Sequence, residues 1–223
     1  MTDNKIQVFD NYLDKKIFEK IKRALLSTKF PWYFNARKVS SGANNLVPPH
    51  LDKYKEDYEG VAEQHQFIHS FLRLNGSRES IIKNIKYPNI KLLYRWDNFT
   101  NTINPLLNTI NPRYWVRVKS NITSATSKNL ISGWHTDLTR FETKKPWMTS
   151  KTGIFYLNTN NGYTLMENGE RIDSVENRFI VFDNKTFHSG VSQTDTKIRI
   201  VINFNFIEHG DLDKDELYKD LGV

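Results

Sequence analysis

The sequence predicts an α+β fold that is mainly β, with a two-sheet jelly roll (double-stranded β-helix) behind an N-terminal helical layer. Amphipathic segments with helical periodicity come before residue 113, whereas short β-branched and aromatic segments separated by turn signals come after it. The 223 residues suit one domain, and the 38% hydrophobic content is enough for a packed core. We therefore expect a helix-rich part over 1–113, a jelly-roll core over 114–207 and a charged C-terminal tail over 208–223.

Three helices are expected in the N-terminal part. Over 14–27, apolar residues recur at intervals of three and four with lysines on the other side, and Asp14 is suited to cap this helix. A second helix is expected over 58–74, ended by Asn-Gly. The third is expected over 99–110, where Pro105 must kink the helix or restart it.

The expected strands are short and are separated by pairs such as Asn-Gly and Ser-Gly, which favour turns. The segment 90–96 is compatible with a strand or a helix, and the polar segment 40–55 is expected to be a loop. The predicted strands span residues 30–34, 115–120, 153–158, 178–183 and 197–207.

The last of these strands has two different faces. Because side chains alternate across a strand, one face carries Arg199, Val201, Asn203 and Asn205. If the opposite, apolar face packs under the helices, Arg199 points between the sheets, where a buried cation needs a partner. The sequence places no obvious acidic residue across from it, so an anionic ligand would satisfy this charge. The apolar face consists of Ile198, Ile200, Ile202, Phe204 and Phe206.

Composition excludes some classes of site. The chain has no cysteine, so it forms no disulfide and no thiolate metal site, and any metal must be held by nitrogen and oxygen ligands. This suits a reducing compartment, and we expect a cytoplasmic protein. No apolar run approaches the length of a membrane span. The net charge of +7 comes from scattered basic residues interrupted by acids, which favours a solvated surface over a nucleic-acid footprint without excluding the latter.

Two histidines and one aspartate form a candidate metal-binding set. His135 and Asp137 are two positions apart and would share one face of a strand, and His188 comes from a distant strand. Two histidines and a carboxylate on one face of an octahedron hold non-haem Fe(II) in oxygenases. Taken alone, an H-x-D pair also arises by chance, and His188 could be a turn or core histidine. The ordered combination with Arg199, eleven residues after His188, is much more specific.

The segments that contain these residues resemble a known family. The resemblance is to the Fe(II)/2-oxoglutarate oxygenases of the prolyl 4-hydroxylase-like type, and especially to compact members found in phages of marine bacteria. It covers roughly residues 114–207. The matching segments are Trp134–Asp137, Ile154–Gly162, Ser174–Phe182, His188 and Arg199–Phe206.

The resemblance implies roles for individual residues. His135, Asp137 and His188 would bind iron, and Arg199 would bind the distal carboxylate of 2-oxoglutarate as a bidentate fork. Tyr156 would help to hold that carboxylate, although it could equally be a plain core aromatic. The implied cofactors are Fe(II), 2-oxoglutarate as co-substrate and O₂, with ascorbate as a further candidate.

Two segments depart from the compact family pattern. Residues 121–132 read as a longer insert, so the residue that contacts the other end of 2-oxoglutarate is not identified, and Asn121 is only a candidate. The basic loop 138–150 follows Asp137, and we interpret it as a surface loop rather than a lid.

The implied activity is hydroxylation by a 2-oxoglutarate/Fe(II)-dependent dioxygenase. The substrate is not identified: peptidyl proline is the analogy-based suggestion, and a peptide, a protein or a small molecule would fit. Two non-enzymatic alternatives remain: a jelly-roll binding protein in which Arg199 holds an anion, and a phage structural protein. If the chain is phage-encoded, its location would be the host cytoplasm. The sequence gives no indication of the oligomeric state.

Overall fold

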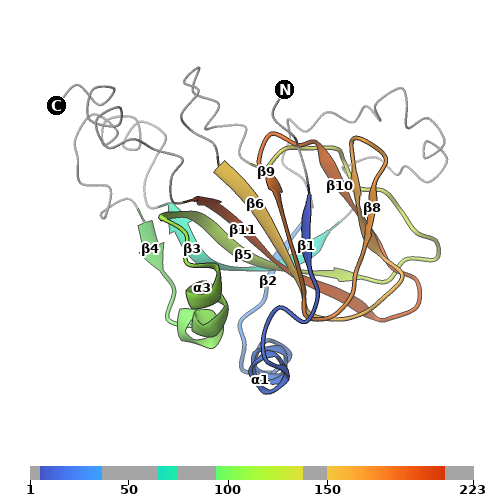
Figure 1. Cartoon of the computed structure of the whole chain (residues 1–223). Coiled ribbons are helices and arrows are strands. Elements are labelled where there is room, and N and C mark those ends of the chain that lie inside the picture. Colours follow the sequence, from blue (N-terminus) through green and yellow to red (C-terminus); the bar gives the residue numbers. More distant parts are fainter. Residues whose placement is uncertain (1–5, 37–64, 75–93, 138–149, 209–223) are drawn as a thin grey trace, which may run out of the picture.

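A computed structural model describes residues 6–36, 65–74, 94–137 and 150–208, which form two antiparallel β-sheets with helices against one of them (Figure 1). The fold is the predicted double-stranded β-helix with an N-terminal helical layer. Within these ranges, no helix combines the length and the apolar character that crossing a bilayer requires.

Among the described residues the larger sheet has eight strands, and β11 (Ile198–Ile207) lies near its middle. This strand lies between β5 (Tyr114–Ser124) and β6 (Ser150–Tyr156) and pairs with both. The strand order is β1 (Gln7–Phe9), β9 (Arg178–Asp183), β6, β11, β5, β3 (Gln66–Leu74) and β2 (Tyr33–Asn35), with β4 (Tyr94–Trp96) also paired to β3.

The helices cover one face of this sheet: α1 (Lys15–Leu25), the 3₁₀ helix η3 (Thr100–Ile103) and α3 (Asn104–Ile110). Asp14 caps α1 as predicted, because its carboxylate accepts hydrogen bonds from two backbone N–H groups of the first turn. Pro105 lies in the first turn of α3, where a missing N–H leaves no hydrogen bond unmade, so it restarts the helix.

The prediction that the apolar face of β11 packs under the helices is confirmed. The apolar residues of its outer face join the helices in one core cluster, in which Ile202 and Phe204 are fully buried. Val201, on the opposite face, belongs to a different cluster that lies between the two sheets. The outer cluster includes Phe18, Ile21, Leu25, Leu106, Leu107, Ile200, Ile202, Phe204 and Phe206.

The smaller sheet covers the other face and consists of β10 (His188–Val191), β7 (Tyr163–Met166) and β8 (Arg171–Asp173), in that order. The segment 131–135 runs beside β10 and is bridged to it at Ile131 and His135. The two sheets enclose an apolar cluster of Ile154, Tyr156, Met166, Ile172, Ile180, Phe182 and Val201.

Some local predictions were wrong. The helix expected over 58–74 is strand β3 in its described part, because these aromatic residues also alternate with period two and the sheet between β2 and β5 buries them. Residues 121–124, which were read as the start of an insert, belong instead to β5, which continues to Ser124 in register with β11. The ambiguous segment 90–96 ends in strand β4.

Other predictions fall where the structure gives no description. The loop expected over 40–55 lies outside the described residues, as does the loop 138–150 apart from Ser150, which begins β6. The charged tail 208–223 also lies outside them, apart from Glu208.

Candidate functional site

The two candidate histidine ligands lie directly opposite each other on neighbouring backbone segments. His135 and His188 exchange two backbone hydrogen bonds, each with an N···O distance of 3.1 Å. Residues paired in this way place their side chains on the same side of the sheet. The centroids of the two imidazole rings are 4.6 Å apart. The smaller sheet therefore brings together two side chains that are distant in the sequence.

Both imidazoles have Nδ1 beside a backbone carbonyl oxygen, so Nε2 is the nitrogen that can bind a metal. Nδ1 of His135 is 2.9 Å from the carbonyl oxygen of Gly133, and Nδ1 of His188 is 3.1 Å from that of Thr186. A carbonyl oxygen only accepts hydrogen bonds, so Nδ1 carries the donated proton, and in the neutral tautomer of such a ring Nε2 has the lone pair. Burial, together with the neighbouring His188, lowers the pKa of His135 to about 4. At neutral pH this ring is in the uncharged form that binds metals.

Asp137 is buried and held by two side chains of the larger sheet. Its Oδ1 is 2.7 Å from Nη2 of Arg117, and its Oδ2 accepts a hydrogen bond of 3.0 Å from Nδ2 of Asn205. Arg117 also donates to Oδ1 of Asn205 at 2.8 Å, and Asn205 donates to the hydroxyl of Thr152. Burial alone would raise the pKa of the Asp137 carboxyl, but the charge of Arg117 holds it well below its usual range. The carboxylate is therefore ionised and fixed in orientation.

The three residues offer ligand atoms at one position between the sheets. One atom from each of His135, Asp137 and His188 lies within 4.8 Å of the other two. Neighbouring ligands at about 2.1 Å from a metal lie roughly 3 Å apart, so binding an ion would require only small side-chain rotations. Each carboxylate oxygen of Asp137 keeps a second lone pair beside its present hydrogen bond. The donor set, two imidazoles and one carboxylate, fits a divalent iron ion.

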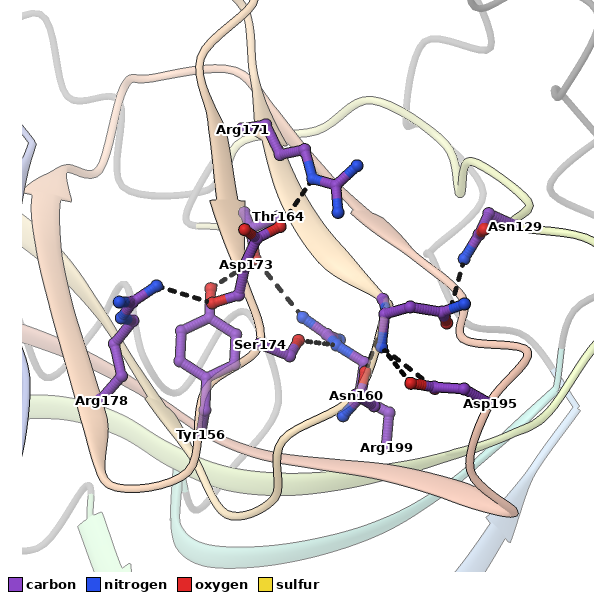
Figure 2. Close-up of polar contacts among 12 residues, drawn as sticks. Asn129, Tyr156, Asn160, Thr164, Arg171, Asp173, Ser174, Arg178, Asp195 and Arg199 are labelled. Atoms are coloured by element: carbon purple, nitrogen blue, oxygen red, sulfur yellow. Dashed lines mark hydrogen bonds and ion pairs between the residues drawn. The ribbon is translucent and has the colours of Figure 1, made fainter.

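Arg199 is buried on the inward face of β11, as its position in the alternating pattern predicted. Its Nε donates to Oγ of Ser174 at 2.8 Å, and its Nη2 is 3.4 Å from Oγ1 of Thr164 (Figure 2). The partners shown for it across the described residues are hydroxyl groups and the Tyr156 ring, and none is a carboxylate. A buried guanidinium with neutral partners is a binding position for an anion.

Tyr156 and Thr164 complete the surroundings of this arginine. The Tyr156 hydroxyl is 2.7 Å from Oγ1 of Thr164, and the guanidinium carbon of Arg199 is 5.5 Å from the centre of the Tyr156 ring. Burial raises the pKa of Tyr156, so its hydroxyl keeps its proton and can donate to an anion. Gly162 is closely packed beside the arginine: a Cβ at that position would lie 2.8 Å from Oδ1 of Asn160, 2.9 Å from the backbone oxygen of Val191 and 3.1 Å from Cδ of Arg199.

A row of polar groups on β5 faces the same interior. Asn121, the candidate contact for the far end of the co-substrate, is opposite Val201, and Thr123 is opposite Arg199. Oδ1 of Asn121, Oγ1 of Thr123 and Oδ1 of Asn203 are buried and have no hydrogen-bond partner within the described part of the chain. Buried polar atoms seldom remain unpaired, so this interior is suited to a polar ligand.

Sequence reasoning missed the residues that support the site. Arg117 and Lys119 could have been found from their alternation with Asn121 on one strand, by the same argument that singled out Arg199. Ser174 and Thr164 carried no signal, because only the pairing of β7 with β8 and β10 brings them to the arginine.

No protein-family model matches the chain, and no curated protein matches it. Among solved structures, an oxidoreductase of the 2OG-Fe(II) oxygenase family from Burkholderia pseudomallei is 10% identical, with 90% of this chain and 84% of that chain covered and a TM-score of 0.49. A Trichoplax adhaerens prolyl hydroxylase, in complex with a hypoxia inducible factor peptide fragment, is 11% identical with coverage of 94% and 86% and a TM-score of 0.48. The epimerase SnoN, in complex with Fe3+, alpha ketoglutarate and nogalamycin RO, is 10% identical with coverage of 91% and 78% and a TM-score of 0.49. Similarities this low assign no function, so the function has to be argued from the site.

Proposed function

We propose that this protein is an Fe(II)- and 2-oxoglutarate-dependent dioxygenase. One observation carries the proposal: two imidazoles and one fixed carboxylate converge between the sheets, and a buried arginine, which has no acidic partner among the described residues, faces the same interior. In this proposal His135, Asp137 and His188 hold the iron, and Arg199 holds the distal carboxylate of 2-oxoglutarate.

The residues of this chain would prepare the site before any chemistry takes place. The carbonyl oxygens of Gly133 and Thr186 fix the tautomer of the two histidines and aim Nε2 at the metal position. Arg117 and Asn205 hold Asp137 as an anion in one orientation. This second layer of hydrogen bonds reduces the rearrangement that metal binding requires.

The co-substrate would be held at its other end by charge and by hydroxyl groups. Arg199 can offer its remaining N–H groups to a carboxylate while Nε stays bonded to Ser174, and Tyr156 and Thr164 can add hydroxyl contacts. The apolar cluster between the sheets, which includes Ile154 and Val201, would keep water from the space between them.

Iron and 2-oxoglutarate, when bound, would supply the oxidising chemistry: O₂ and 2-oxoglutarate are consumed, succinate and CO₂ are formed, and one oxygen atom enters the substrate. We propose hydroxylation of a C–H bond, with peptidyl proline as the first substrate to test.

The experiment that tests this function is an anaerobic titration of the protein with Fe(II) and then 2-oxoglutarate. We expect a visible charge-transfer band that saturates at one equivalent of each component. His188→Ala should abolish the band, whereas His65→Ala should leave it unchanged, because His65 is exposed and stands outside the site. Absence of the band in the unmodified protein, with no succinate formed in air, would instead favour a binding protein that uses Arg199 to hold an anion.

A further inference from the structure

A second cation, the half-buried Lys119, faces the interior of the proposed site. Lys119 lies on β5 directly opposite Asn203 of β11 and Ser70 of β3. It has the same parity as Arg117, which reaches Asp137, whereas Val118 on the alternate face belongs to the core under the helices. The ammonium group is therefore directed into the space between the sheets, near the proposed metal site.

Lys119 has no polar partner among the residues that the structure describes. Burial, together with repulsion from Arg117, lowers its pKa to about 8 against the opposing attraction of Asp137. At neutral pH most molecules therefore still carry this positive charge. On the opposing strand, Oδ1 of Asn203 is buried and also lacks a partner. A charged donor and a free acceptor face each other across one pair of strands, and a polar ligand would satisfy both.

The charges of the described interior do not balance. The guanidinium of Arg117 is neutralised by Asp137, and Arg178 at the sheet edge has its own surface ion pair. Lys119 and Arg199 remain, and together they leave two positive charges without a counter-charge. A divalent metal and the dianion 2-oxoglutarate would cancel each other, so the loaded site would keep the same excess. Uncompensated charge in a partly desolvated interior is costly and attracts an anion.

We propose that Lys119 receives an anionic group, a carboxylate or a phosphate, of the primary substrate. This inference rests on the proposed function, since it assigns 2-oxoglutarate to Arg199 and leaves Lys119 to the substrate. A peptide would meet the requirement only through an acidic side chain or its C-terminal carboxylate. A neutral small molecule would not meet it.

Fluorinated probe anions test the assignment without knowledge of the natural substrate. The protein is loaded with Zn(II) and 2-oxoglutarate, which fills Arg199, and is titrated with trifluoroacetate or with monofluorophosphate while the ¹⁹F resonance is followed. We expect saturable binding of one of the two anions, and the preferred probe identifies the anionic group as carboxylate or phosphate. Neutral trifluoroethanol should show no saturable binding at this position.

Matched variants assign the binding to Lys119. Lys119→Met should weaken the preferred anion at least tenfold, and Lys119→Arg should retain most of the binding because it keeps the charge. Lys151→Met is the control, since Lys151 is opposite Phe206 and lies on the other face of the same sheet. Equal binding by the unmodified protein and by Lys119→Met, or no saturable binding of either anion, would overturn the proposal.

Two further measurements separate this inference from its premise. If Lys119→Met weakens 2-oxoglutarate itself tenfold or more, the lysine serves the co-substrate and the substrate assignment is wrong. If the unmodified protein does not bind 2-oxoglutarate at all, the proposed function fails. In that case the anion titration is made on Arg199→Met protein without metal or 2-oxoglutarate. If adding Lys119→Met abolishes anion binding, an anion site at this lysine is still supported. If binding is unchanged, the proposed anion site is overturned.

Discussion

Replacing Lys119 by methionine is expected to stabilise the protein near neutral pH. The folded state holds this ammonium in a partly desolvated position beside Arg117, with no described partner, whereas the unfolded chain leaves it in water. Methionine has a similar length and no charge, so it fills the same space without the cost of desolvation. A binding role would explain why a residue that lowers the stability of the protein lies at a candidate site.

The magnitude follows from the pKa of this one group. The pKa falls from its ordinary value of 10.5 to about 8, and each tenfold change in proton binding is worth about 1.4 kcal/mol, so the charge costs up to about 3 kcal/mol. Because the side chain keeps some contact with solvent, we expect Lys119→Met to gain about 1–3 kcal/mol. Between pH 8 and 10.5 the unfolded state binds more protons than the folded state, so the stability of the unmodified protein rises with pH in this window. The advantage of the variant should therefore be full below pH 8 and should fade by about pH 10.5.

The assay is urea unfolding of both proteins at several pH values from 7 to 10.5, in buffers without binding anions. Lys151→Met is measured in parallel and should show no comparable gain in this pH range. A gain that does not change with pH would mean that methionine acts through apolar packing, and a loss of stability at pH 7 would mean that the ammonium has a favourable partner. Either result would refute the reasoning.

The remaining predictions concern the metal and co-substrate ends of the site. Arg199→Ala should weaken 2-oxoglutarate binding about 30- to 150-fold in the anaerobic titration, because bidentate charge-assisted bonds are worth about 2–3 kcal/mol. Arg199→Lys should recover part of this affinity. Arg171→Ala, at an exposed arginine, should leave the affinity unchanged. Unaltered affinity in folded Arg199→Ala would make the arginine a structural residue. Gly162→Ala should weaken 2-oxoglutarate in the same titration, since the new Cβ would lie 2.8 Å from Oδ1 of Asn160, 2.9 Å from the backbone oxygen of Val191 and 3.1 Å from Cδ of Arg199, so the surroundings of the arginine must shift. Asn205→Ala should lower metal affinity about 10- to 100-fold by calorimetry, because it frees Asp137 from one of its two supports, and unchanged affinity would show that Arg117 alone suffices.

The pattern of the last strand was sufficient to predict both the core and the interior. Isoleucine and phenylalanine alternate with mostly polar residues in this strand. In a sheet that helices cover on one face, this alternation fixes which face of the strand lies under the helices. The described structure has Ile202 and Phe204 under the helices and Arg199 between the sheets, as this alternation requires. The Asp14 cap and an interruption of the helix at Pro105 were also predictable, because both depend on the chemistry of a single residue; the structure decided for a restart over a kink.

The sequence was less informative where a helix and a strand would bury the same side chains. The segment 66–74 satisfies helical and strand periodicity alike, and the choice of strand was made by its neighbours, which supply backbone hydrogen bonds on both sides. Local propensity does not contain this information, since it depends on residues that are distant in the chain.

By itself, the sequence determined which side chains of this protein share a face, and hence that an arginine would be buried without an acid nearby and that His135 and Asp137 would lie close together. Only the tertiary structure decided which groups meet across strands. It placed His188 opposite His135, gave each imidazole a carbonyl partner, put Arg117 and Asn205 on Asp137, and left Lys119 facing Asn203. Alternation along a strand follows from local geometry, whereas register between strands follows from the packing of the whole sheet.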